Sequence, residues 1–120
     1  MSNDILSQKK ILLADSSSLV LSILTKAFES EGFTVFTATD GKTALELIKT
    51  EKPAYVAVNS KLPVIDGPSL CRIIKYGMNQ KSTICAVFSV DTKWRKPSDF
   101  ACVDIEIPLL KTKYNTLFLQ

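Results

Sequence analysis

Short continuous apolar runs recur along the chain, and polar residues and then a stretch with helical spacing follow each of them. Residues 11–14 (ILLA), 54–58 (AYVAV) and 84–88 (ICAVF) have the unbroken hydrophobicity of strands that are buried on both faces. Residues 33–39 and 103–107 are rich in β-branched or other apolar side chains and complete a set of five strands. Such strands need helices on both faces of one sheet, which restricts the chain to a parallel α/β fold.

The segments between these runs carry the spacing and end signals of helices. One helix is predicted over 19–31, with Ser17 or Ser18 as its cap and Gly32 as its stop. The other helices are predicted after Asp40 and Gly41, from Pro68 to Gly77, over 91–101 as a short or irregular helix, and over 111–119. The expected architecture is a doubly wound, five-stranded parallel sheet, a (βα)5 sandwich of the flavodoxin type.

Length and composition fit one folded domain. The chain has 120 residues, of which 46% are hydrophobic and 22% charged. This is enough apolar material for one core, whereas no apolar run reaches the roughly 20 residues that cross a bilayer. We expect residues 1–9 to be a disordered or extended lead and residues 10–120 to form the domain. The first ten residues lack the basic-then-apolar order of a secretory signal, which favours a cytoplasmic location without membrane association.

The residue counts exclude several kinds of chemistry. The sequence contains no histidine, so histidine-based triads, histidine metal sites and imidazole switches are excluded. Cys71, Cys85 and Cys102 are odd in number and widely spaced, which predicts neither a disulfide framework nor a zinc site. Fifteen Lys and Arg against twelve Asp and Glu give a net charge of +3, too weak a bias to require nucleic acid as a partner. We expect no cofactor and no metal.

Polar residues follow the predicted strands at the place where a functional crevice is expected. In a doubly wound sheet this crevice lies at the carboxyl ends of the strands. Those ends are Asp15 and Ser16 after the first strand, Asn59 after the third, Ser89 after the fourth, and Ile107 with Pro108 at the fifth. These residues therefore carry the functional hypothesis.

Several segments resemble a bacterial response-regulator receiver domain, and the resemblance runs over residues 10 to about 119. The segments are ILLADSSSLV (11–20), TATDGKTALELIK (37–49), KPAYVAVNSKLPVIDG (52–67) and ACVDIEIPL (101–109). The third is the most specific, because it places Pro63, Asp66 and Gly67 at a fixed distance after a buried strand. The resemblance implies the receiver fold and favours a cis peptide bond before Pro108.

In the receiver family, a phosphoryl group is transferred onto an aspartate with the help of Mg²⁺, two further acids, a hydroxyl and a lysine. The matching motifs put the acidic pair at Asp15 and Ser16, the nucleophile at Asn59, the hydroxyl at Ser89 and the lysine at Ile107. A carboxamide cannot attack phosphorus as a carboxylate does, and Mg²⁺ usually takes one or two carboxylates. Loss of the lysine together with its acidic partners avoids an unpaired, partly buried cation. We interpret the chain as a degenerate pseudo-receiver.

The main functional hypothesis is a phosphorylation-independent signalling module of a two-component-type system, which is not an enzyme. Its partner would be a signalling protein, an attached output domain or a second copy of the chain. Receivers commonly bind partners through the face built by the fourth helix, the fifth strand and the last helix. Here seventeen residues separate Ser89 from Ile107, a few fewer than the family pattern usually has, which would remodel this face. The interface candidates on this face are Trp94, Arg95, Lys96 and Tyr114.

Other interpretations remain open at this point. A small anion or a nucleotide would bind at the start of the first helix through the loop Ser16–Ser18, although the carboxylate of Asp15 would repel a phosphate. Direct nucleic-acid binding through Lys93–Lys96 and residues 111–113 is a weaker hypothesis for this domain alone. Asp15 itself more often caps a helix or accepts backbone amides than binds a cation, and Asn59 is well suited to hydrogen-bond a strand end.

Overall fold

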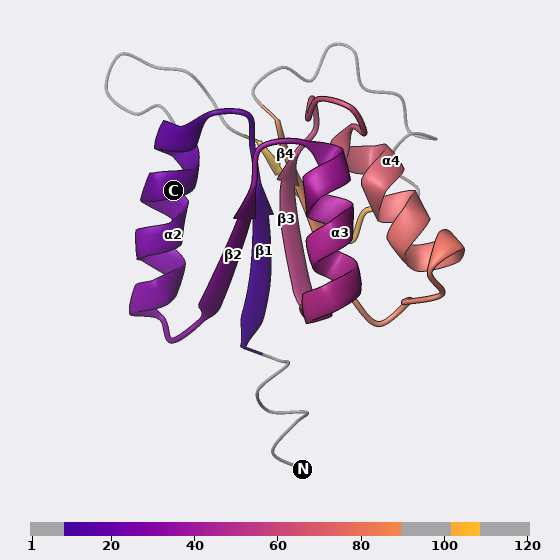
Figure 1. The fold of residues 1–120 in the computed structure, drawn as a ribbon, viewed down its shortest axis with the longest axis horizontal. Coiled ribbons are helices and arrows are strands. Elements are labelled where there is room, and N and C mark those ends of the chain that lie inside the picture. Colours follow the sequence, from indigo (N-terminus) through magenta and orange to yellow (C-terminus); the bar gives the residue numbers. More distant parts are fainter. Residues whose placement is uncertain (1–8, 90–101, 109–120) are drawn as a thin grey trace.

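The computed structural model describes residues 9–89 and 102–108, which form a five-stranded parallel sheet with helices on both faces (Figure 1). The strand order is β2-β1-β3-β4-β5. The strands are β1 (Lys10–Ala14), β2 (Thr34–Ala38), β3 (Tyr55–Asn59), β4 (Ile84–Ser89) and β5 (Ile105–Pro108). The described helices are α2 (Ser18–Ser30), α3 (Gly41–Glu51) and α4 (Gly67–Arg72), and α4 continues into the π-helical turn η1 (Ile73–Gly77). The predicted doubly wound α/β fold is confirmed.

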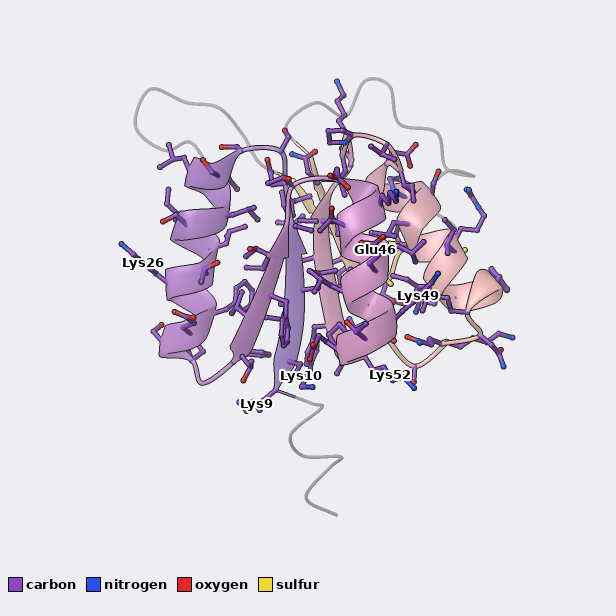
Figure 2. All side chains as sticks on the ribbon, viewed as in Figure 1. Lys9, Lys10, Lys26, Glu46, Lys49 and Lys52 are labelled. Carbon is purple, nitrogen blue, oxygen red and sulfur yellow. The ribbon has the colours of Figure 1, made fainter. Side chains whose placement is uncertain are left out.

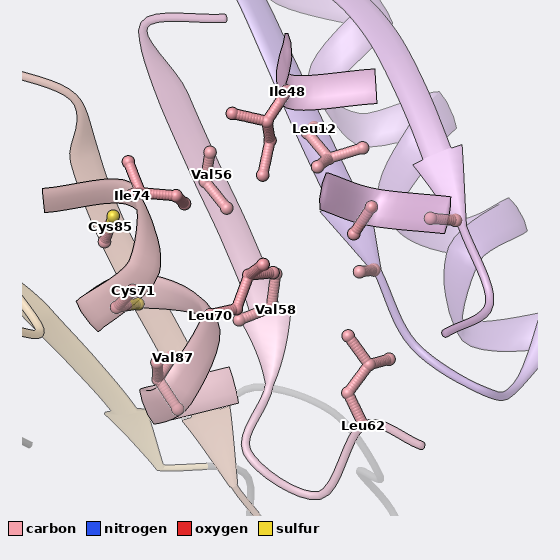
Figure 3. Close-up of a cluster of buried hydrophobic side chains, with 13 residues drawn as sticks. Leu12, Ile48, Val56, Val58, Leu62, Leu70, Cys71, Ile74, Cys85 and Val87 are labelled. Carbon is pink, nitrogen blue, oxygen red and sulfur yellow. The ribbon is translucent and has the colours of Figure 1, made fainter. Parts of the chain in front are cut away.

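The two faces of the sheet bury separate apolar clusters, because successive strand residues point to opposite faces. On one face, Leu12 and Val56 pack with Ile48 of α3 and with Leu70 and Ile74 of α4 and η1, all fully buried (Figure 3). The cluster on the other face lies under α2 and contains Ile11, Leu13, Leu21, Leu24, Ala57, Ala86 and Phe88. The apolar runs of β1, β3 and β4 are therefore continuous because each of these strands contributes side chains to both clusters.

The cysteines are free thiols of this core. Cys71 and Cys85 are buried in the cluster under α3 and α4, and Cys102 is half-buried against it. A hydrogen bond to the sulfur of Cys85, together with burial, raises the pKa of the Cys71 thiol. Cys71 and Cys85 are therefore neighbouring free thiols in the fold, although they are widely spaced in the sequence.

Side chains cap the starts of the helices, as predicted at Ser17 for α2. The hydroxyl of Ser17 accepts a hydrogen bond from the Val20 amide at 3.2 Å and caps α2. The carboxylates of Asp40 and Asp66 cap α3 and α4 in the same way, at 2.7 Å and 2.8 Å from the Thr43 and Ser69 amide nitrogens. After α2, Gly32 adopts a φ of 91°, a conformation that glycine allows without a side-chain clash.

Two elements differ from the sequence-based expectation. The helix predicted from Pro68 to Gly77 widens into a π-helical turn, because the Met78 amide donates to the Ile73 carbonyl five residues before it. The fifth strand begins at residue 105 rather than 103, because the Asp104 side chain, and not a strand carbonyl, accepts the Cys85 amide at 2.7 Å.

Several expectations fall outside the described residues. These are the lead over residues 1–8, the helices over 91–101 and 111–119, and the interface candidates Trp94, Arg95, Lys96 and Tyr114. Within the described ranges no peptide bond is cis, so the cis bond expected before Pro108 is not found. In that part of the chain, no helix has the length and apolar character that a membrane span requires.

Candidate functional site

The carboxyl ends of the strands bring the predicted site residues to one edge of the sheet. Asp15 directly follows β1, and Asn59 and Ser89 are the last residues of β3 and β4. The strand register pairs Asn59 with Phe88 and Phe88 with Ile107, so these residues form one row across β3, β4 and β5. The structure therefore gathers the positions at the edge where the sequence placed them.

Asp15 is a buried carboxylate whose two oxygens are both used. Only 4% of the surface of Asp15 is exposed. Oδ1 accepts a hydrogen bond from the Ser17 amide at 2.8 Å, and Oδ2 accepts one from Nδ2 of Asn59 at 2.9 Å. These two charge-assisted hydrogen bonds offset the cost of burying the carboxylate. Asp15 thus accepts a backbone amide, which is one of the structural roles that the sequence analysis gave it.

The carboxamide of Asn59 bridges Asp15 and the following loop. While Nδ2 donates to Asp15, Oδ1 accepts the Lys61 amide at 2.8 Å. The opposite orientation would set Oδ1 against the Asp15 carboxylate and Nδ2 against an N–H group, so this network determines which end of the amide faces Asp15. Asn59 therefore presents a donor, and not an oxygen, to the centre of the pocket.

The loop from Ser60 to Gly67 closes the site against the sheet. The Ser60 amide donates to the Phe88 carbonyl at 2.9 Å, and the Gly67 amide donates back to the Ser60 carbonyl at 3.1 Å. A Cβ atom at Gly67 would lie 2.7 Å from the Asn59 carbonyl oxygen, which explains the need for glycine in the Asp66-Gly67 pair. The Pro63 carbonyl accepts the Gly41 amide at 2.8 Å and so ties the loop to the start of α3.

The remaining predicted positions offer little to a ligand. Ser16 is exposed, and Ile107 is half-buried and packs against the apolar cluster under α2. In the serine loop, the Ser17 amide already donates to Asp15, and its hydroxyl already caps α2. Among the described residues, no group of three His, Cys, Asp or Glu side chains is placed to hold a metal ion.

Two features of the site region were missed in the sequence. One is the direct hydrogen bond between Asp15 and Asn59; their shared edge was predicted, but their pairing depends on side-chain directions. The other is Asp104, which anchors β5 by accepting the Cys85 amide and pairing with Lys75 at 2.6 Å. The only sequence signal for Asp104 was an acidic residue at the entry of an apolar strand.

Comparisons with known proteins agree with this geometry. A model of the response regulator receiver domain matches residues 11–110. The alkaline phosphatase synthesis transcriptional regulatory protein PhoP of Bacillus subtilis (strain 168) is 36% identical over 67 residues, which are 56% of this chain and 28% of PhoP. The receiver domain of the Francisella response regulator 1452 has a TM-score of 0.74 at 26% identity, over 91% of this chain and 87% of that chain.

A more distant structure shares the fold alone. The receiver domain of a Pseudomonas aeruginosa sensor histidine kinase, which holds a magnesium ion in its active-site cleft, has a TM-score of 0.75 at 17% identity over 89% of each chain. Receiver domains of two-component systems interact with signalling partners or output domains, and they are generally not enzymes although they carry phosphotransfer chemistry. The family match, the doubly wound sheet and the loop after β3 lead to one assignment: the chain belongs to the response-regulator receiver domain family.

Proposed function

We propose that this chain is a pseudo-receiver, a receiver domain that is not phosphorylated on an aspartate and signals through protein–protein contacts. The observation that carries the proposal is Asn59, the last residue of β3, at the position where the family resemblance implies the phosphoacceptor. Its carboxamide is neutral and is engaged at both ends by Asp15 and the Lys61 amide. A group of this kind lacks the charge with which a carboxylate attacks phosphorus.

The donor set of the pocket also does not fit the magnesium ion that the family chemistry requires. Mg²⁺ needs a nearly complete octahedron of oxygens. Asp15 is the carboxylate at this position, and its two oxygens already accept N–H groups of Ser17 and Asn59. The N–H group of Asn59 that faces Oδ2 is a donor, and a donor at that place opposes a cation. Ser16 contributes a hydroxyl position where the resemblance implies an acid.

The position implied for the lysine supports the same proposal. Ile107 is apolar and packs against the cluster under α2. A cation there would have one carboxylate, Asp15, to pair with, and that carboxylate already has two hydrogen bonds. The pocket is thus self-contained in its hydrogen bonds, because the polar atoms of Asp15 and Asn59 are paired with each other and with backbone amides.

The output of such a module is binding. We propose that the chain contacts a signalling protein or an attached output domain, or forms a homodimer, through the face that includes β5 and the residues 91–101 and 111–119. Trp94, Arg95, Lys96 and Tyr114 are the residues we assign to this face, on sequence grounds alone. Light scattering of the unaltered chain and of Trp94→Ala tests the homodimer, which the substitution should weaken.

Incubation with acetyl phosphate and Mg²⁺, followed by intact-mass measurement, tests the main proposal. We expect no phosphorylated species, whereas a receiver with a complete acidic pocket acquires one in parallel. Asn59→Asp is the matched variant, because it restores the carboxylate and changes no other group of the pocket. Acid-labile phosphate on the variant alone would identify Asn59 as the block. Stoichiometric acid-labile phosphorylation of the unaltered chain would sink the proposal.

A further inference from the structure

The edge of the sheet opposite the candidate site is basic. Because the strands are parallel, their amino ends meet at this edge, and lysines stand at the entries of β1, β3 and β4. Figure 2 shows Lys9, Lys10 and Lys52 along this lower edge and Lys49 above them. The acidic residues at this edge are Glu31 before β2, Glu51 before β3, and Asp104 before β5, which pairs with Lys75. The lysines of this edge, which we call the amino-edge lysines, are Lys9, Lys10, Lys49, Lys52 and Lys81.

Several amino-edge lysines are held in place by aromatic rings. The ammonium of Lys9 lies 5.0 Å from the ring centroid of Phe33, and that of Lys81 lies 5.6 Å from the ring of Tyr76. Lys10 pairs with Glu51 at 3.5 Å. In contrast, the ammonium groups of Lys49 and Lys52 have no carboxylate partner within the described ranges. The edge therefore keeps positive charge that no carboxylate neutralises. The partial negative charge at the carboxyl end of α3, which lies beside these lysines, offsets only part of it.

A cleft of about 370 Å³ opens at this edge between the turn before β3 and the turn before β4. It contains no acidic residue, whereas two other clefts in the described part of the chain include Glu29 in one case and Asp104 in the other. Its polar residues are a lysine, a glutamine, a serine and a threonine, and the buried Thr83 hydroxyl donates to Oε1 of Gln80 at 3.5 Å. The lining residues are Lys52, Pro53, Ala54, Gln80, Ser82 and Thr83.

Hydrogen-bond donors are available around this cleft. In the turn before β4, the amides of Lys81 and Ser82 donate to no acceptor among the residues that the structure describes. Ser82 is exposed, so its hydroxyl is accessible to a ligand. Lys52 sits at the carboxyl end of α3 with a φ of 48°, which directs the chain sharply from the helix into the cleft wall. Of Lys81 and Ser82, it is Ser82 that lines the cleft. A free amide and a hydroxyl beside a lysine are donors that bind phosphate oxygens.

We propose that this cleft binds a phosphate group, with Lys52 as the main cation and the amide and hydroxyl of Ser82 as hydrogen-bond donors. The other amino-edge lysines raise the local concentration of such an anion. A cation is disfavoured because the lining has no carboxylate. The phosphate belongs either to the free ion or to a nucleotide, since both present the same oxygens. The inference is independent of the pseudo-receiver proposal, because the two sites lie at opposite edges of the sheet.

Nitrogen–proton correlation spectra of the full chain, titrated with inorganic phosphate at constant ionic strength, test the inference. We expect the amide of Ser82 to shift saturably, and Lys52→Gln to weaken the affinity by about tenfold or more. Lys26→Gln is the matched control: it removes the same charge from α2, on a different side of the molecule (Figure 2), and should leave the affinity within about twofold. Ser82→Ala, an exposed substitution, provides a second variant that should also weaken binding.

The remaining arms of the experiment distinguish the source of the phosphate. Binding of ADP much tighter than inorganic phosphate identifies a nucleotide, and equal binding identifies the free ion; both support the site. Equal shifts with chloride would overturn it, as would an absence of saturation. Equal weakening by the Lys52 and Lys26 substitutions would show unspecific charge attraction and would overturn it too.

Discussion

Asp15 depends on two donors for its place in the interior. Asp15→Asn keeps the shape of the side chain but turns one of its acceptors into a donor, so the Ser17 amide or the Asn59 amide loses its partner. We expect a loss of about 1–3 kcal/mol in the free energy of unfolding, measured by urea denaturation. Asp40→Asn is the control, because that exposed carboxylate caps α3 and asparagine caps a helix equally well. Equal losses in both variants would contradict this assignment.

Val64 carries backbone strain at the tip of the loop after β3. It has a φ of 73° and is 75% exposed, and the Ile65 amide donates to the Pro63 carbonyl across it at 2.8 Å. This is a γ-turn of the strained kind, and a β-branched residue is poorly suited to it. We expect Val64→Gly to raise the free energy of unfolding by about 1 kcal/mol, after the greater entropy of glycine in the unfolded chain is subtracted.

The control for this loop is Val64→Thr, which keeps the β-branch and the exposure. Thermal or urea unfolding should place this variant within about 0.5 kcal/mol of the unaltered chain. Stabilisation by threonine to the same extent as by glycine would show that the backbone conformation is not the cause.

Asp104 sets the start of β5 and anchors that edge strand to the rest of the fold. Its Oδ2 accepts the Cys85 amide at 2.7 Å and pairs with Lys75 at 2.6 Å. We expect Asp104→Ala to cost about 1–2 kcal/mol, because the carboxylate is partly exposed and its ion pair is screened. Hydrogen exchange should speed up at the Cys85 amide. Asp104→Asn retains an acceptor for that amide and should lose less, and the reverse order would contradict the anchor.

The elements that could be predicted from the sequence are those with local signals. The strand β1 is an unbroken apolar run, and α2 has its own cap at Ser17 and its stop at Gly32, so their bounds differ from expectation by a residue at most. The start of β5 and the π-helical turn could not be predicted in this way. Both depend on contacts between groups whose partners are known only from the folded chain, such as the Asp104 carboxylate with the Cys85 amide.

The candidate site shows the same division. Its location followed from topology, because every carboxyl end of a parallel strand meets the same edge. The mutual hydrogen bond of Asp15 and Asn59 required the direction of both side chains. The cleft at the amino edge was missed because its residues, Lys52 and Ser82 among them, come from two turns that are ordinary in sequence.

The net charge of +3 is distributed unevenly over the molecule. Acidic caps and Asp15 lie at the carboxyl edge of the sheet, while the amino-edge lysines lie at the other. We propose that Ser16 and Asn59 stand where a phosphorylatable receiver has acids. The absence of these two negative charges at the carboxyl edge accounts for part of the net positive charge. The positive charge itself is exposed mainly at the amino edge, where Lys10 pairs with Glu51 but Lys49 and Lys52 have no carboxylate partner among the described residues.

The balance of charge in the pocket predicts how Asn59→Asp should affect the whole molecule. The new carboxylate replaces a donor that lies 2.9 Å from Oδ2 of Asp15, so two like charges face each other at neutral pH. We expect a loss of roughly 2 kcal/mol in the free energy of unfolding at pH 7. The repulsion raises the pKa of one carboxyl in the folded state above its unfolded value of about 4. The loss is therefore full above the raised pKa and disappears as the pH falls below about 4.

Magnesium and a double substitution separate the causes of this loss. Two facing carboxylates can bind Mg²⁺, so millimolar Mg²⁺ should raise the melting temperature of Asn59→Asp and leave that of the unaltered chain unchanged. The combined variant Asp15→Asn/Asn59→Asp again has one carboxylate and one carboxamide, so it should regain most of the stability and lose the response to Mg²⁺. An equal response of the unaltered chain would mean that Asp15 already binds the cation despite its two N–H donors, and the self-contained pocket would then be wrong.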